Sequence, residues 1–315
     1  MIAPFVVFGF SVVILLLSTR VFVSVSENIS KSFRVSPLII GVTIVALGTS
    51  LPELAVSTVA ILKHDVGLAF GNIIGSNIAN ILLVFPVGIL LGKLRVGTTK
   101  TQKNALLVLL VTGLFALLHF LHFPPLFSGL LLISLSLVTT VLQYHWAEYG
   151  RNHEDVSKFK KNSADKPVTR LSYFFLLFSL IGITVGGIAV VTSVEQISIL
   201  IGLSTTILGL SLTAICTSLP ELLTTIFSQE EHQEKITLGN IAGSNIYNLL
   251  LIGGVISIFS TNSRIPTIDW LWLIGATLIF TVLLKKFAGM VIPKKIGVIL
   301  LVLAVIYLLS LAQTF

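Results

Sequence analysis

The sequence predicts an all-α integral membrane protein of ten transmembrane helices, arranged as two inverted repeats of five helices each. Three observations lead to this fold class. The chain is 55% hydrophobic and only 10% charged, its mean hydropathy is +1.02, and one long motif occurs twice along it. A soluble domain carries about 25% charged residues, so the composition excludes a water-soluble fold.

Long apolar stretches follow one another closely along the chain. A helix crosses the bilayer core with about 20 mostly apolar residues. The ten stretches that satisfy this requirement lie at residues 2–19, 36–62, 67–92, 104–121, 124–144, 171–192, 197–228, 236–260, 267–284 and 296–313.

The basic residues predict how these spans are oriented. Ten spans place the loops alternately on two sides, and of the 20 Lys and Arg residues all but Lys63 and Arg264 fall on one side. Because loops rich in Lys and Arg stay in the cytoplasm, we expect a multi-pass protein of the cell membrane with both termini extracytoplasmic. The same distribution explains the net charge of +7 through topology, so we expect no nucleic-acid partner.

One long polar stretch divides the chain. Residues 1–147 form the first five-helix repeat, residues 148–170 a cytoplasmic linker, and residues 171–315 the second, inverted repeat. The single cysteine, Cys216, can form no intramolecular disulfide. We therefore expect packing and hydrogen bonding within the lipid bilayer to hold the fold together, as a monomer.

The duplicated motif identifies the repeat. Residues 49–80 and 217–248 align without a gap at an offset of 217 − 49 = 168, and both contain TSLPE and GSNxxN. Five helices, an odd number, separate the copies, so the second copy enters the membrane from the opposite face. Inverted repeats are typical of secondary transporters, whose substrate sites lie near the midplane where the repeats meet.

Glu53 and Glu221 are the only acidic residues predicted deep within spans. An ionised side chain there costs at least about 2.5 kcal/mol, and a bound cation would offset this cost. Pro52 and Pro220 precede them and lack the N–H that would bond the carbonyl four residues back. We expect the second, third, seventh and eighth spans to be broken helices whose free carbonyls line a cation site.

Further oxygen donors surround the glutamates at helical spacing. Residues 46, 49 or 50, and 53 share one helix face, and Ser76 and Asn80 share another. Asn72 and Asn240 lie between paired glycines and either cap the broken helices or bind ions. The candidate ligands are Ala46, Thr49, Ser50, Glu53, Ser76, Asn80, Ala214, Thr217, Ser218, Glu221, Ser244 and Asn248.

The chemistry of these donors indicates hard cations. They offer oxygens and no paired His or Cys, which favours Ca2+ or Na+ over zinc or copper. Ca2+ and Na+ are thus the expected partners, as transported ions, and we expect no cofactor. We expect no enzymatic activity, because the chain lacks a cluster of nucleophile, base and orienting group and lacks a phosphate-binding glycine loop.

At these residues the sequence resembles the sodium/calcium exchanger branch of the calcium/cation antiporter superfamily. GTSLPE at residues 48–53 and CTSLPE at residues 216–221 are similar to its two alpha-repeat signatures, each followed by GSNxxN. The resemblance implies secondary active antiport of Ca2+ for Na+ by alternating access, with the first and sixth helices sliding against the other helices.

The resemblance also implies roles for single residues. Ca2+ would be held by the carboxylates of Glu53 and Glu221 and the backbone carbonyls of Thr49 and Thr217. Flanking Na+ sites would be lined by Ser50, Ser218, Ser76 and Ser244 with the carbonyls of Ala46 and Ala214, and Asn80 and Asn248 would lie between them.

Two departures from the family pattern leave alternatives open. Cys216 replaces the usual glycine, and Asn248 stands where some relatives carry Asp. The second departure removes one candidate proton or cation site. Because the motifs do not specify the coupling ion, H+- or K+-coupled Ca2+/cation exchange is the nearest alternative to Na+ coupling. A passive cation channel is an alternative of a different class, although carboxylate rings in a channel do not require inverted halves.

Overall fold

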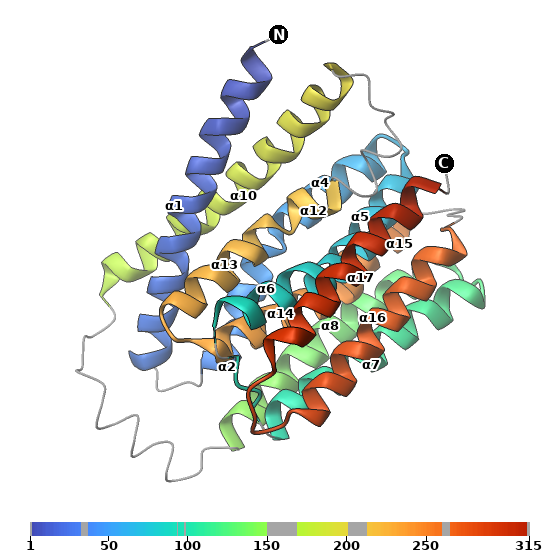
Figure 1. The fold of residues 1–315 in the computed structure, drawn as a ribbon. Coiled ribbons are helices and arrows are strands. Elements are labelled where there is room, and N and C mark those ends of the chain that lie inside the picture. Colours follow the sequence, from blue (N-terminus) through green and yellow to red (C-terminus); the bar gives the residue numbers. More distant parts are fainter. Residues whose placement is uncertain are drawn as a thin grey trace.

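The computed structural model describes residues 2–32, 37–92, 94–97, 99–149, 169–200, 213–259 and 265–313. Regular structure in these ranges is helical, apart from one isolated antiparallel bridge between Arg95 and Val291. Figure 1 shows the helices as a bundle. The elements are α1 (Ala3–Ser32), α2 (Pro37–Ile40), η1 (Gly41–Val45), α3 (Ala46–Thr49), α4 (Leu51–Leu62), α5 (Val66–Ala79), η2 (Asn80–Val84), α6 (Phe85–Leu91), α7 (Thr99–Phe120), α8 (Pro125–Tyr149), α10 (Arg170–Leu200), α12 (Ala214–Thr217), α13 (Leu219–Glu230), α14 (Glu234–Tyr247), η4 (Asn248–Ile252), α15 (Gly253–Phe259), α16 (Thr267–Lys286) and α17 (Lys294–Gln313).

Nine helical runs in these described ranges are long and apolar enough to cross a bilayer. They correspond to nine of the ten predicted spans, so the prediction of an all-helical membrane protein is confirmed. The remaining predicted span, 197–228, includes residues 201–212, which lie outside the described residues, and α12 and α13 belong to its described part. Most of the predicted linker, residues 150–168, also lies outside them.

Two of the predicted spans, 2–19 and 171–192, are too short. α1 and α10 contain 30 and 31 residues, which is about 45 Å at 1.5 Å per residue. Arg20 was expected to begin a loop, yet it lies inside α1, where its guanidinium is 5.9 Å from the centroid of the Phe227 ring. A basic residue ends an apolar window but does not end a helix, because its long side chain can reach polar surroundings.

The elements at and around the duplicated motif have the same boundaries in the two halves. Adding 168 to the bounds of α3, α4, α5, η2 and α6 gives the bounds of α12, α13, α14, η4 and α15. The backbone at Ser50 has φ −84° and ψ 2°, and at Ser218 it has φ −79° and ψ 3°. The local backbone therefore follows the duplicated motif in both halves.

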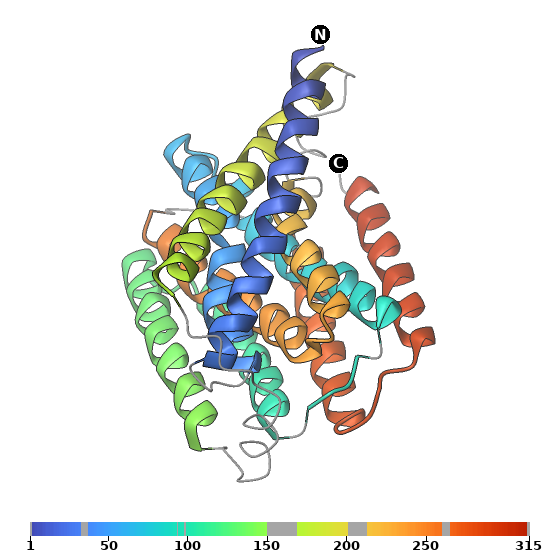
Figure 2. The ribbon, with the colours of Figure 1, turned by 90° about the vertical axis from the view of Figure 1, so that its left-hand side faces the viewer.

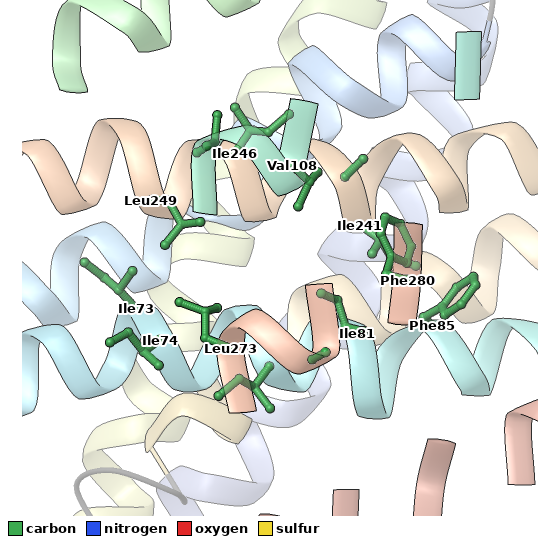
Figure 3. Close-up of a cluster of buried hydrophobic side chains, with 14 of the residues drawn as sticks. Ile73, Ile74, Ile81, Phe85, Val108, Ile241, Ile246, Leu249, Leu273 and Phe280 are labelled. Atoms are coloured by element: carbon green, nitrogen blue, oxygen red, sulfur yellow. The ribbon is translucent and has the colours of Figure 1, made fainter. Parts of the chain in front are cut away.

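The central helices are those that carry the motif. In the most apolar 18 residues of each span, 83% are buried in Val66–Leu91 and in Glu234–Phe259, against 28% in Ala3–Ile29. Figure 3 shows the apolar core that α5, α6, α14 and η4 form with α7 and α16. Its labelled side chains are Ile73, Ile74, Ile81, Phe85, Val108, Ile241, Ile246, Leu249, Leu273 and Phe280.

α1 and α10 form a separate pair at the edge of the bundle, where they cross one another (Figures 1 and 2). A Cβ at Gly186 would lie 3.2 Å from the backbone nitrogen of Leu15, so the two helices are in near-backbone contact. A Cβ at Gly187 would lie 2.8 Å from Cγ of Pro52 and 4.0 Å from Cγ of Pro220. α10 thus also packs directly on the proline of each motif copy.

Candidate cation-binding site

Glu53 and Glu221 lie in the first turns of α4 and α13, and both are fully buried. Each follows a serine at which the chain leaves one short helix and begins the next. The free N–H groups and the dipole of a helix favour negative charge at its first turn. The TSLPE sequence therefore places a carboxylate at the positive end of a helix in each half.

The first motif copy reaches the carboxylate of the second. Ser50 Oγ donates to Oε1 of Glu221 at 3.4 Å. Both carboxylate oxygens of Glu53 and Oε2 of Glu221 lack a hydrogen-bond partner in the described part of the chain. Nearly all buried polar atoms of native proteins are paired, so these oxygens require positive charge from a cation or from protons.

The threonines of the motif connect the two halves. Thr49 Oγ1 donates to Oδ1 of Asn240 at 3.1 Å and lies 3.3 Å from Oγ of Ser244. The second copy repeats this pattern, since Thr217 Oγ1 donates to Oδ1 of Asn72 at 3.1 Å. Its distance to Oγ of Ser76 is also 3.1 Å. Each TSLPE segment therefore lies against the GSNxxN helix of the other half.

The carbonyls of Ala46 and Ala214 face the same region. Ser244 Oγ lies 3.4 Å from the oxygen of Ala46, and Ser76 Oγ lies 3.4 Å from the oxygen of Ala214. This approach depends on the absence of a side chain at Gly243, where a Cβ would lie 2.5 Å from Cβ of Ala46. The paired glycines of α14 thus allow it to approach the first motif copy closely.

Asn80 and Asn248 begin the π-helical turns η2 and η4, a backbone form that is frequent at functional sites. Asn80 Nδ2 donates to Oδ1 of Asn245 at 3.2 Å. Oδ1 of Asn80 and both side-chain polar atoms of Asn248 have no partner within the described residues. Sequence reasoning missed Asn245 as a contact of the site, although the same asparagine recurs in the first copy as Asn77.

Asn72 acts as a connector. Its Nδ2 donates to Ser57 Oγ at 2.9 Å and lies 3.4 Å from the backbone oxygen of Glu53, while its Oδ1 accepts from Thr217. Ser50 and Ser218 are both buried, but only the hydroxyl of Ser218 has no hydrogen-bond partner among the described residues. Side-chain contacts therefore join candidate ligands of the two halves, with Asn72 and Asn240 beside them, whereas Ser218 and Asn248 make no side-chain hydrogen bond to the others within the described residues.

The arrangement offers oxygens from two carboxylates and from neutral hydroxyl, amide and carbonyl groups. No three His, Cys, Asp or Glu side chains come together in the described ranges. Six to eight oxygens suit Ca2+, and softer metals prefer nitrogen or sulfur ligands. Chemically, the site is suited to hard cations.

Comparisons with known proteins agree with this chemistry. The family model described as sodium/calcium exchanger protein matches residues 3–145 and 171–312. A sodium/calcium exchanger of Methanosarcina acetivorans, MaX1, is 29% identical over 289 residues, covering 81% of this chain and 83% of the relative. An uncharacterised membrane protein of Methanocaldococcus jannaschii is 33% identical over 245 residues, covering 78% and 77%.

A solved structure extends the similarity to the whole fold. The sodium-calcium exchanger NCX_Mj, soaked with Na+ and Sr2+, superposes with a TM-score of 0.81 at 27% identity. The match covers 99% of both chains.

Proposed function

Because the chain belongs to the sodium/calcium exchanger family, we propose that it exchanges Ca2+ for Na+ across the membrane by alternating access. The observation that carries this proposal is the pair of fully buried carboxylates of Glu53 and Glu221, three of whose oxygens have no partner in the described part of the chain. A transported cation would supply the missing charge. Family membership makes the chain a cation transporter, not an enzyme.

In this proposal Ca2+ is bound by Glu53, Glu221 and the backbone carbonyls of Thr49 and Thr217. Two carboxylates balance the charge of Ca2+, and carbonyl oxygens add to its coordination shell. The hydroxyls of both threonines already donate to asparagine side chains. A hydroxyl that donates its hydrogen keeps lone pairs on its oxygen, so the choice of the threonine carbonyls as ligands rests on the family resemblance.

Na+ is bound at flanking sites that overlap the Ca2+ site, so the two ions compete. The paired approach of serine hydroxyls to the alanine carbonyls in both halves supports this assignment. The unpartnered Oδ1 atoms of Asn80 and Asn248 are available as further oxygen ligands. The Na+ ligands are Ser50, Ser218, Ser76, Ser244 and the carbonyls of Ala46 and Ala214, with Asn80 and Asn248 between them.

Access alternates because the halves are inverted and the α1–α10 pair slides across the rest. The odd number of helices between the motif copies supports the inversion. The helix breaks after Thr49 and Thr217 and the π-turns at Asn80 and Asn248 support broken helices whose carbonyls face the ions. The packing of Gly187 on both motif prolines lets movement of α10 reach each copy.

We further propose that the protein works as a monomer in the cell membrane with both termini extracytoplasmic. The distribution of Lys and Arg supports this orientation. The beginning of α1 and the end of α17 lie on the same side of the bundle in Figures 1 and 2, in keeping with an even number of spans.

Ion-substitution flux in liposomes tests the function. Purified protein in Na+-loaded liposomes should accumulate radioactive Ca2+ when external Na+ is replaced by choline, and liposomes carrying Glu221→Gln should not. Uptake driven equally by a K+ or pH gradient would overturn Na+ coupling in favour of the alternative antiporters. Ca2+ flux that needs no counter-ion would overturn exchange in favour of a channel.

A further inference from the structure

α13 carries a row of buried hydroxyls that continues from the cation site. Thr224, Thr225 and Ser228 follow Glu221 by three, four and seven residues, so they share its helix face. All three are fully buried, and none of their hydroxyls has a hydrogen-bond partner among the described residues. Helical Thr and Ser normally bond the carbonyl four residues back, as Thr58 does to Leu54 at 2.6 Å.

The first half has no such row. At the equivalent positions of α4 it carries Val56, Ser57 and Ala60. Ser57 Oγ accepts from Nδ2 of Asn72 at 2.9 Å. In the second half the equivalent atoms, Oγ1 of Thr225 and Nδ2 of Asn240, are both unpartnered in the described ranges. The unpaired polar atoms are thus a property of one half and not of the motif.

The surroundings of the row differ in the same direction. A Cβ at Gly88 of α6 would lie 3.1 Å from Cγ2 of Thr225 and 3.2 Å from Cγ2 of Thr237. The methyl groups of both threonines therefore pack against a glycine of α6. Across the equivalent face of the first half stands Ile256 in place of glycine, and Ala69 in place of Thr237.

Gln229 closes the far end of the row. Its Nε2 donates to Oγ1 of Thr237 at 3.1 Å, and a Cβ at Gly92 would overlap its Oε1. The side chain therefore fills the space above a glycine, at the end of α13 where the turn to α14 begins. Only 8% of Gln229 is exposed.

We propose that Thr224, Thr225 and Ser228 of α13, with Thr237 of α14, line a hydrated path that leads cations between the central site and the α13–α14 turn. Gln229 is the gate of this path. This inference rests on the proposed function. A buried water typically makes about three hydrogen bonds to otherwise unsatisfied groups, so hydration accounts for the unpaired hydroxyls. Neutral oxygens of this kind solvate a passing Na+ or Ca2+ without holding it as carboxylates would.

The charge at the mouth of the path agrees with cation passage. Glu230, Glu231 and Glu234 lie at the α13–α14 turn. The equivalent positions of the first half are Leu62, Lys63 and Val66. A negative rim raises the local concentration of cations. By the predicted orientation this mouth is cytoplasmic.

Cysteine modification tests the path without requiring transport. In a Cys216→Ala background, Ser228→Cys and Ala60→Cys are exposed to a water-soluble cationic methanethiosulfonate in permeabilised liposomes. Because only a hydrated thiol forms the reactive thiolate readily, Ser228→Cys should be modified at least about tenfold faster than Ala60→Cys. Equal rates in two monodisperse variants would overturn the path, whatever the outcome of the flux assays.

The gate is tested by adding Gln229→Ala to Ser228→Cys. Modification should become faster by about threefold or more, because the side chain that fills the space at Gly92 is gone. The matched control adds Ile61→Ala to Ala60→Cys and should leave that rate unchanged. An unchanged rate for Ser228→Cys would overturn the assignment of Gln229 as the gate.

Discussion

The motif elements of the two halves have the same backbone conformation but differ in their side chains. α4 and α13 each have 12 residues and begin with Leu-Pro-Glu. Beyond the glutamate, however, Val56 and Ala60 in one half correspond to Thr224 and Ser228 in the other. The halves thus have the same residues at the proposed ion site and different residues beyond it, on helices of equal length.

The largest expected effect comes from the carboxylates, where the halves should be equivalent. Glu53→Gln and Glu221→Gln should each weaken Ca2+ transport more than about 100-fold, because loss of one buried charge partner costs about 3–5 kcal/mol. Isotope uptake in liposomes measures this. Asp65→Asn is the control, since Asp65 is an exposed helix cap whose carboxylate accepts from the N–H of Leu68. Uptake close to that of the unmodified protein in one variant would mean that the halves contribute unequally.

A smaller effect is expected where α14 meets the first motif copy. Gly243→Ala would place a Cβ 2.5 Å from Cβ of Ala46, and overpacking of this kind costs about 1–3 kcal/mol. Because the added methyl group moves Ser244 away from Ala46, Na+ affinity should fall by up to about tenfold. The Na+ dependence of exchange measures this affinity. Gly113→Ala, where nothing lies within 4 Å, should behave as the unmodified protein. Equal Na+ affinity in the two variants would contradict the importance of this contact.

Exchanging the differing residues sharpens the comparison. Thr224→Val together with Ser228→Ala gives α13 the residues of α4 at these positions. Exchange should slow by about fivefold, since dehydration of the path adds about 1 kcal/mol to ion passage, while Ca2+ affinity stays the same. Thr58→Val removes a hydroxyl that is bonded within its own helix and should leave the rate unchanged. A loss of affinity with an unchanged rate would place these hydroxyls in the binding site instead.

An effect on stability, and not on transport, separates the two asparagines. Asn80 donates to Asn245, whereas Asn248 has no side-chain partner within the described residues. Asn80→Asp should therefore destabilise the protein by about 1–3 kcal/mol through an unpaired buried acceptor, while Asn248→Asp should lower the melting temperature less. Thermal unfolding in detergent compares the two. A melting temperature that is lower for Asn248→Asp than for Asn80→Asp would contradict the prediction that Asn80 makes the more important hydrogen bond.

Several features of the site follow from residue order alone. An ionised carboxylate in an apolar span requires a compensating charge, so the sequence predicts Glu53 and Glu221 as a candidate cation site. The TSLPE and GSNxxN repeats also identify which spans to compare. The length of α1 does not follow in this way, because Arg20 interrupts the hydropathy pattern without interrupting the helix.

Contacts across helices were beyond the reach of sequence reasoning. Asn80 is hydrogen-bonded to Asn245, and the hydroxyls of Thr49 and Thr217 donate to asparagines of the opposite half. These bonds depend on how closely α3, α5, α12 and α14 approach one another. The unpaired hydroxyls of Thr224 and Ser228 were also invisible in the sequence, where a helical hydroxyl is expected to bond its own backbone.

By itself the sequence determined that the chain is a membrane protein, that it is duplicated, and that two acids lie in its apolar interior. Hydrophobicity and local spacing carry that information, since both act along a single helix. Only the tertiary structure decided which polar atoms are paired and which are left open toward ions or water. Pairing depends on distances between helices far apart in sequence, and glycines such as Gly88 and Gly243 set those distances.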